Sequence, residues 1–266
     1  MIYKNVKENL YVGDKCILKD TDSLILLPRK NVLSRYKSDN TKYNNKQENQ
    51  IIATNIDLAI IVVAVDNPPL HPRFIDRYII LLKKAKIPFI ILFNKMDLQN
   101  SNLQNVINIY RDLGITIVTN SFIDNNTKEI KELICNKNVI FIGQSGVGKS
   151  TIISAITQKK QIKTQEVSSQ SKRGKHTTTA TELYLWNPTS AIIDSPGIRS
   201  ISLKNYTLKD IEEGFMEFTK YKNHCFYKDC HHVQENNCGI KNAVLKGKIS
   251  SERYQSYLKI LQEVGK

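Results

Sequence analysis

Two short motifs stand in an inverted order along this chain. The tetrapeptide Asn94-Lys95-Met96-Asp97 precedes a glycine-rich segment with the spacing of a phosphate-binding loop, Gly143-Gln144-Ser145-Gly146-Val147-Gly148-Lys149-Ser150-Thr151. Folds that carry both motifs ordinarily place the phosphate loop first. The inversion indicates a circular permutation, which an open sheet tolerates because its natural termini lie near each other at the surface. The order therefore predicts an α/β fold with a permuted, Rossmann-like sheet.

The phosphate loop has the sequence context that its chemistry requires. Residues 138–142 have the pattern of a short buried strand, and residues 149–157 have the pattern of a helix start. The three glycines between them let backbone N–H groups face an anion at the helix N-terminus. Lys149 would reach the β- and γ-phosphates, and the Ser150 hydroxyl would ligate Mg²⁺. A plain glycine-rich turn is the alternative, but the strand and helix around the loop favour phosphate binding.

The tetrapeptide indicates which base is bound. Guanine offers two adjacent donors, N1–H and the exocyclic amine, and the Asp97 carboxylate can accept both. Lys95 can lay its methylene stem on the base, and Asn94 can tether the loop through its amide. The motif begins where the apolar run 88–93 ends, which is the edge at which open α/β sheets bind ligands. GTP and GDP are therefore the predicted ligands.

Two further segments complete a nucleotide site. Asp194 follows the apolar run 191–193 and would hold Mg²⁺, while the N–H of Gly197 would sense the γ-phosphate. Between the phosphate loop and Asp194 lies a polar segment that predicts a mobile switch loop, with one threonine closing on Mg²⁺. Spacing leaves open which threonine does so: Thr177, Thr178 or Thr179. Because the permutation leaves the chain after Gly197 outside this domain, a nucleotide-driven movement there would be transmitted to a C-terminal module.

That module contains a cluster of metal-binding residue types. Cys225, Cys230, His232 and Cys238 make three thiolates and one imidazole, the composition of a closed structural zinc site. Such a set leaves no open position for water, so catalysis by the metal is not expected. The neighbours His224 and His231 could each replace His232. A disulfide or a chance cluster is the alternative, but no secretory signal peptide is evident and the other two cysteines are isolated.

Taken together, these motifs identify a family resemblance. The chain resembles the circularly permuted, ribosome small-subunit-dependent GTPases of bacteria and organelles. The matching segments run through nearly the whole sequence: 27–35, 55–57, 94–97, 143–151, 174–179, 194–197, 229–232 and 253–257. The resemblance implies GTP hydrolysis stimulated by the small ribosomal subunit, contact with its rRNA, zinc at the cysteine and histidine cluster and an OB-type N-terminal barrel. It also implies a monomer in the cytoplasm, or in an organelle matrix.

We expect three domains. Residues 1–53 would form a truncated OB-type β segment, because only eleven residues precede the Val12-Gly13-Asp14 turn and relatives have a longer barrel. Residues 54–202 would form the permuted GTPase domain, and residues 203–266 a helical zinc-binding module. Residues 38–50 are uniformly polar, which predicts disorder.

Net charge favours a polyanionic partner. The 39 Lys and Arg exceed the 25 Asp and Glu, which gives +14 and a pI near 9.4. This excess is typical of factors that bind RNA, although a lysine-rich composition alone would produce it too. No apolar run of 18 residues is present, so a membrane partner is not expected.

The sequence lacks one side chain that GTP hydrolysis ordinarily uses. In Ras-type enzymes a glutamine after the Asp-x-x-Gly glycine orients the attacking water, and here Ile198 stands in that place. We expect slow hydrolysis by the free protein, with Lys149 essential and His176 the candidate for orienting water. A solvated loop histidine is the alternative for His176. Two other functions stay open: a nucleotide-gated rRNA-binding scaffold with negligible turnover, and a zinc-finger regulator of nucleic acid with an ancillary phosphate loop.

Overall fold

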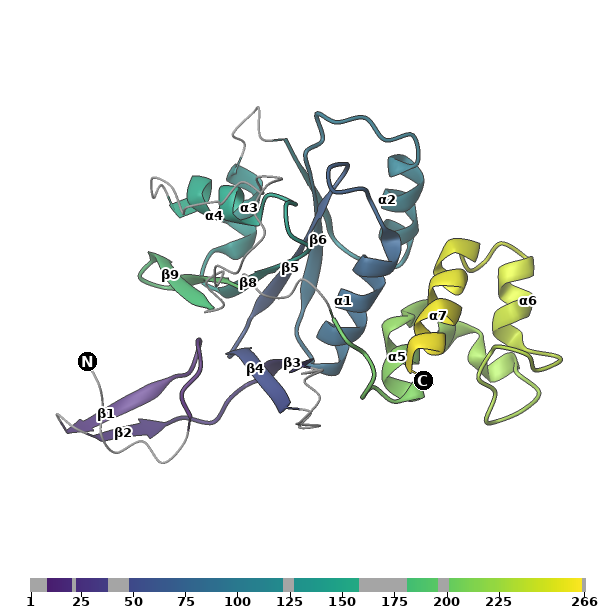
Figure 1. Cartoon of the computed structure of the whole chain (residues 1–266), viewed down its shortest axis with the longest axis horizontal. Coiled ribbons are helices and arrows are strands. Elements are labelled where there is room, and N and C mark those ends of the chain that lie inside the picture. Colours follow the sequence, from purple (N-terminus) through teal and green to yellow (C-terminus); the bar gives the residue numbers. More distant parts are fainter. Residues whose placement is uncertain are drawn as a thin grey trace, which may run out of the picture.

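The computed structural model describes residues 9–20, 23–37, 48–121, 127–157, 181–195 and 201–264. Figure 1 shows a central sheet with helices on both faces and a helical C-terminal part beside it. The strands are β1 Cys16–Asp20, β2 Ser23–Leu26, β3 Val32–Lys37, β4 Glu48–Thr54, β5 Leu58–Ala64, β6 Phe89–Asn94, β7 Ile117–Asn120, β8 Asn138–Ile142, β9 Glu182–Asn187 and β10 Ser190–Asp194. The helices are α1 Pro72–Lys84, α2 Leu103–Asp112, α3 Lys128–Ile134, α4 Lys149–Thr157, α5 Leu208–Gly214, α6 Gly239–Leu245 and α7 Ser251–Val264, with 3₁₀ turns η1 Met216–Lys220 and η2 Lys222–His224.

The central sheet has six strands in the order β7-β6-β5-β8-β10-β9. All neighbours pair in parallel except β9, which runs antiparallel to β10 at one edge. The predicted α/β fold with a permuted sheet is confirmed. The edge strand β7 begins at Ile117, and Ile115 and Thr116 belong to the connection from α2. No helix among the described elements combines the length and apolar character needed to cross a bilayer.

Alternating side chains of the sheet build two cores, one on each face. Along β5, Ala59 and Ile61 face α1 and α2, whereas Ile60 and Val62 face α3 and α4. The parallel strands are buried on both faces, which explains their nearly continuous apolar sequence. The first core continues into α5, α6 and α7, so the C-terminal helices share a core with the face of the sheet that carries α1 and α2.

The C-terminal module packs on α1 through a close helix contact. A Cβ atom added to Gly214 would lie 2.3 Å from Ile80 Cγ1, so only glycine allows this approach. The helix α5 of this module is followed by the 3₁₀ turn η1. Thr207 begins α5 with a capping box, in which its hydroxyl accepts from the Asp210 N–H.

The N-terminal strands form two separate antiparallel pairs, β1–β2 and β3–β4, within residues 9–20, 23–37 and 48–54. The truncated OB-type segment stays a prediction. Residues 48–50 belong to β4, so the predicted disorder is wrong for them, since they pair with residues 35–37 of β3. Residues 38–47 lie outside the described part of the chain. The division at residue 53 stays a prediction, and Leu33 and Ala53 are fully buried in the core that contains α1.

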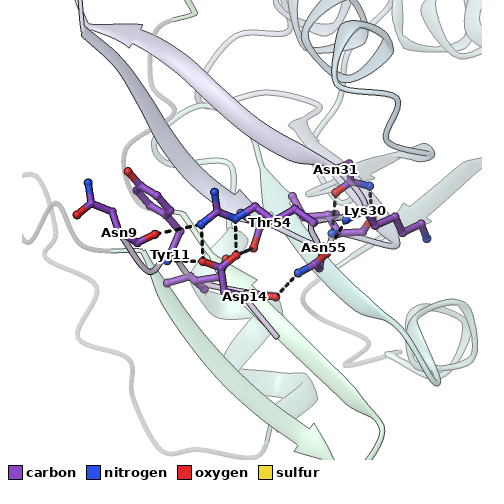
Figure 2. A network of polar contacts seen from close by, with 11 residues as sticks. Asn9, Tyr11, Asp14, Lys30, Asn31, Thr54 and Asn55 are labelled. Atoms are coloured by element: carbon purple, nitrogen blue, oxygen red, sulfur yellow. Dashed lines mark hydrogen bonds and ion pairs between the residues drawn. The ribbon is translucent and has the colours of Figure 1, made fainter. Parts of the chain in front are cut away.

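A polar network ties the turn at Val12–Asp14 and the segment that follows β2 to the end of β4 (Figure 2). The Asp14 carboxylate accepts hydrogen bonds from Arg29 Nε and Thr54 Oγ1, each at 2.7 Å. Burial raises the pKa of Asp14, but these hydrogen bonds and the Arg29 charge outweigh burial and hold the pKa below its ordinary value. Gly13 has a φ of +94°, and a Cβ there would lie 2.1 Å from the Thr54 carbonyl oxygen. The turn at Gly13 is therefore fixed against the end of β4.

Candidate functional site

The predicted phosphate loop connects β8 to α4 at the carboxyl edge of the parallel strands. Its glycines take left-handed φ values of +150° at Gly143, +81° at Gly146 and +95° at Gly148, which side chains with a Cβ avoid. Lys149 folds back over the loop, and its Nζ donates to the carbonyl oxygens of Gly143 at 2.9 Å and Gln144 at 2.8 Å. The lysine ammonium thus lies at the mouth of the loop, where phosphate oxygens could replace these carbonyls as its acceptors.

The tetrapeptide lies beside this loop, although the two are separated along the chain. Asn94 ends β6, is fully buried, and donates from Nδ2 to the Val147 carbonyl oxygen at 2.8 Å. A Cβ on Gly148 would lie 2.3 Å from the same amide nitrogen, so this close contact requires glycine there. Asn94 therefore links the two predicted nucleotide motifs directly.

Side chains at the end of β7 hold the tetrapeptide from its other side. Asn120 Nδ2 donates to Asn94 Oδ1 at 3.0 Å, and Ser121 Oγ donates to Asp97 Oδ1 at 3.1 Å. The sequence motifs gave the side chains of Asn120 and Ser121 no role. The parallel register of Asn94 with Asn120 explains the contact. Lys95 Nζ donates to the carbonyl oxygen of Asn67, another partner that the motif does not contain.

Asp194 ends β10 at the same edge. Its carboxylate is buried, and Oδ1 has no hydrogen-bond partner among the described residues. Burial raises the pKa of Asp194 above its ordinary value, while the nearby Lys149 charge acts in the opposite direction. A buried carboxylate oxygen without a partner beside a cationic side chain fits a site for Mg²⁺ with nucleotide phosphates. The Lys149 charge thus acts on Asp194, and Ser150 follows Lys149 in the first turn of α4.

Several predicted site residues cannot be placed. Gly197, His176 and the three threonines Thr177, Thr178 and Thr179 lie outside the residues that the structure describes. The predicted switch contacts and the orientation of water by His176 therefore stay predictions.

The second cluster is compact. One ligand atom from each of Cys225, Cys230, His232 and Cys238 lies within 4.8 Å of the others. His232 Nδ1 is 3.5 Å from Cys225 Sγ and 3.4 Å from Cys238 Sγ. These separations suit four ligands around one tetrahedral ion with bonds of about 2.0–2.3 Å. The cluster fits a metal. His224 and His231, the other two histidines of the segment, are exposed.

Burial changes the pKa values of the imidazole and the thiols of this cluster. Burial lowers the pKa of His232, which keeps the imidazole neutral and able to coordinate. Burial raises the pKa of Cys230 to about 12, so a metal would have to displace the thiol proton. Because Nδ1 faces the sulfurs, Nε2 faces outward, 3.8 Å from Glu212 Oε1 on α5. Tyr254 on α7 fixes the backbone here, since its hydroxyl donates to the His232 carbonyl oxygen at 2.7 Å.

Comparisons with known proteins find relatives over most of this chain. The family model described as RsgA GTPase matches residues 26–204. A protein of Chlorobaculum parvum is 32% identical over 238 residues, covering 89% of this chain and 76% of its own. One of Flavobacterium psychrophilum is 37% identical over 239 residues, covering 88% and 72%. Both carry the name small ribosomal subunit biogenesis GTPase RsgA.

Solved structures give the same fold. The crystal structure of YjeQ from Thermotoga maritima matches with a TM-score of 0.75 and 28% identity, covering 96% of this chain and 84% of that one. YloQ, described as a circularly permuted GTPase, matches with a TM-score of 0.67 over 97% and 93% of the two chains. At 22% identity the second match supports the fold alone.

Proposed function

The chain belongs to the RsgA GTPase family, and from this membership we propose that it hydrolyses GTP as an assembly factor of the small ribosomal subunit. The observation that carries the proposal is the hydrogen bond from Asn94 Nδ2 to the Val147 carbonyl oxygen. It joins a guanine-recognition motif to a phosphate loop, so one nucleotide can contact both. The names of the relatives favour a hydrolase over a scaffold with negligible turnover.

Each part of the nucleotide has a candidate partner. The guanine edge would bind the Asp97 carboxylate, whose Oδ1 is already oriented by Ser121. The base plane would pack on the side chain of Lys95. The phosphates would accept hydrogen bonds from the backbone N–H groups of the loop and from Lys149. Mg²⁺, held by Ser150 and Asp194, would supply charge neutralisation for the phosphates. Gly197 and one of the three threonines would respond to the γ-phosphate.

Hydrolysis also needs a group that orients water. Ile198 cannot do so, because an aliphatic side chain neither donates nor accepts hydrogen bonds. We propose that His176 supplies this group once the small subunit is bound. Free protein would then turn over slowly.

The metal of the cysteine and histidine cluster is proposed to be one structural Zn²⁺. Three thiols and one imidazole favour zinc over the oxygen-binding cations. Within the proposed division, residues 203–266 form this zinc module, residues 54–202 the GTPase domain and residues 1–53 the truncated OB-type segment. The net charge of +14 supports rRNA of the small subunit as the partner of a cytoplasmic, or organellar, monomer.

Small subunits are expected to stimulate GTP turnover by ~10²-fold or more, in the manner of activators that complete a GTPase site. The measurement is phosphate release from GTP by purified protein, titrated with small subunits at two salt concentrations. Stimulation should weaken as salt rises, because contacts to rRNA phosphates release counterions. His176→Ala should remove the stimulation while leaving nucleotide binding intact.

Large ribosomal subunits and ATP serve as the controls for that titration. Equal stimulation by large subunits would contradict the assembly role, and equal turnover of ATP would contradict guanine recognition. An unstimulated, negligible rate under all conditions would favour the scaffold.

Cys238→Ser is expected to abolish stoichiometric zinc binding. Cys238 Sγ lies 3.9 Å from Cys225 Sγ and also caps α6, where it accepts from the Lys241 N–H. Serine would remove a soft thiolate ligand from the closed set, and zinc binding is coupled to folding in such sites. Metal content of the purified protein and its thermal midpoint test this. Cys135→Ser is the matched control, since Cys135 is an exposed free cysteine; equal zinc loss in both variants would refute the assignment.

A further inference from the structure

A cleft of about 770 Å³ lies between the N-terminal end of α1 and one face of α7. Its wall includes the apolar side chains of Pro72, Phe74 and Ile201. This volume is in the range of small-molecule sites, and nine of the twelve lining residues have polar or charged side chains, which favours a polar or charged ligand. The described residues that line it include none from the phosphate loop or the cysteine and histidine cluster. The cleft is therefore distinct from both sites described above.

The acidic side chains of the cleft already have partners. Glu263 forms an ion pair with Arg77, and Arg77 Nη1 also donates to the Ile201 carbonyl oxygen at 2.8 Å. Glu252 accepts a hydrogen bond from Asn105 Nδ2 at 3.0 Å. Neither carboxylate needs a ligand to satisfy it.

Two cationic side chains of the cleft differ in this respect. Arg73 and Lys259 line it from opposite helices, and neither has an ion-pair partner among residues of the described segments. Burial lowers the pKa of Arg77, and the Arg73 charge lowers it further, which indicates that the two arginines repel each other across the cleft wall. An added anion would relieve this repulsion.

Two buried polar atoms of residues that line the cleft, one on each helix, lack hydrogen-bond partners within the described structure. They are Arg73 Nε and Ser256 Oγ. Ser256 is only 5% exposed and lies on the face of α7 that lines the cleft. Leaving such an atom without a hydrogen-bond partner lowers the stability of the protein. An acceptor-rich ligand in the cleft would satisfy both.

The first turn of α1 adds a third favourable feature. His71 occupies the N-cap position and makes no side-chain cap, Pro72 follows, and the turn contains no acidic residue. The positive end of the helix dipole is therefore uncompensated by the helix itself, and an anion near it is stabilised.

We propose that this cleft binds a phosphate group attached to an apolar or aromatic moiety, with Arg73, Ser256 and Lys259 as its ligands at the N-terminus of α1. A tetrahedral phosphate has enough oxygens to accept from donors on two helices at once, whereas a carboxylate has two oxygens in one plane. His71 and Phe74, whose ring centroids are 6.1 Å apart, provide an aromatic wall for the attached moiety. A free phosphorylated metabolite and a nucleotide of an RNA strand share this chemistry.

The test uses the full chain saturated with GDP and Mg²⁺, so that the phosphate loop is already occupied. Calorimetric titration with uridine 5′-phosphate should give one site, and uridine without phosphate should give none. Arg73→Gln and Lys259→Gln should each weaken binding about tenfold or more, because each removes a charge-assisted contact. Lys248→Gln, an exposed lysine outside the cleft, removes the same charge and should leave the dissociation constant unchanged.

A uridine hexamer distinguishes the two sources of phosphate. Tighter binding of the hexamer, with the same dependence on Arg73 and Lys259, assigns the cleft to RNA; tighter binding of the mononucleotide assigns it to a free metabolite. Because Arg73 is partly buried, thermal midpoints accompany both titrations, and the exposed Lys259 gives a second, independent variant. If neither probe binds, or if both variants bind like the unaltered chain, the proposal is wrong.

Discussion

Lys149→Ala is expected to lower GTP turnover by about 10²-fold or more, both with and without small ribosomal subunits. The lysine Nζ lies over the loop, within 2.9 Å of the Gly143 carbonyl oxygen and 2.8 Å of that of Gln144. Phosphate oxygens that replace those carbonyls would interact with the full positive charge of the lysine in a partly enclosed site. Removing the ammonium leaves developing negative charge on the γ-phosphate without its nearest protein cation. The measurement is single-turnover hydrolysis with radiolabelled GTP.

Lys137→Ala is the matched control for this variant. Lys137 also donates from Nζ to a backbone carbonyl, that of Leu133 at 2.6 Å, but it lies at the opposite end of β8 from the phosphate loop. Its loss should change stability slightly and turnover not at all. A Lys149→Ala protein that keeps more than about a tenth of the normal rate would remove this lysine from the proposed mechanism.

The nucleotide motifs were predictable because their signal is local. Each predicted segment ends a strand, and parallel strands bring their carboxyl ends to one edge of the sheet. This explains why the run before Asn94 and the run before Gly143 could be assigned to strands that meet at one site. The roles of the Asn120 and Ser121 side chains could not be predicted, because they depend on the register between β6 and β7. Register is a tertiary property that one strand's sequence does not contain.

The packing of the C-terminal module on α1 could not be predicted from the sequence either. The permutation suggested a connection through the segment after Gly197 alone. The structure adds a second connection, because α5 and α7 also pack on α1, and Arg253 of α7 forms a hydrogen bond with Asp76, 177 residues earlier. A nucleotide-dependent movement of the chain after Gly197 would therefore act on a module that is already held to α1, rather than on one that moves freely.

Arg253→Met is expected to lower the free energy of unfolding by about 3–5 kcal/mol, the cost of breaking a buried ion pair by removing one partner. Arg253 is 2% exposed, and its guanidinium donates to Glu217 at 2.9 and 3.0 Å, to Asp76 and to the Gly214 carbonyl oxygen. Burial alone would lower the pKa of Arg253, but the Asp76 and Glu217 charges outweigh it and raise the pKa. Without the cation, two buried carboxylates face each other uncompensated.

Urea unfolding of Arg253→Met, of the triple variant Arg253→Met/Asp76→Asn/Glu217→Gln and of Arg111→Met separates charge from packing. The triple variant should recover much of the lost stability, since no buried charge is left unpaired. Arg111 is exposed on α2 with one weak hydrogen bond to Asn108, so its replacement should change stability by no more than about 0.5 kcal/mol. If the triple variant were as unstable as the single one, packing of the arginine stem, rather than its charge, would hold the C-terminal module on α1. The module would then be held by the apolar contacts of α5 and α7 with α1 and by the remaining ion pairs, Lys84 with Asp210 and Arg77 with Glu263.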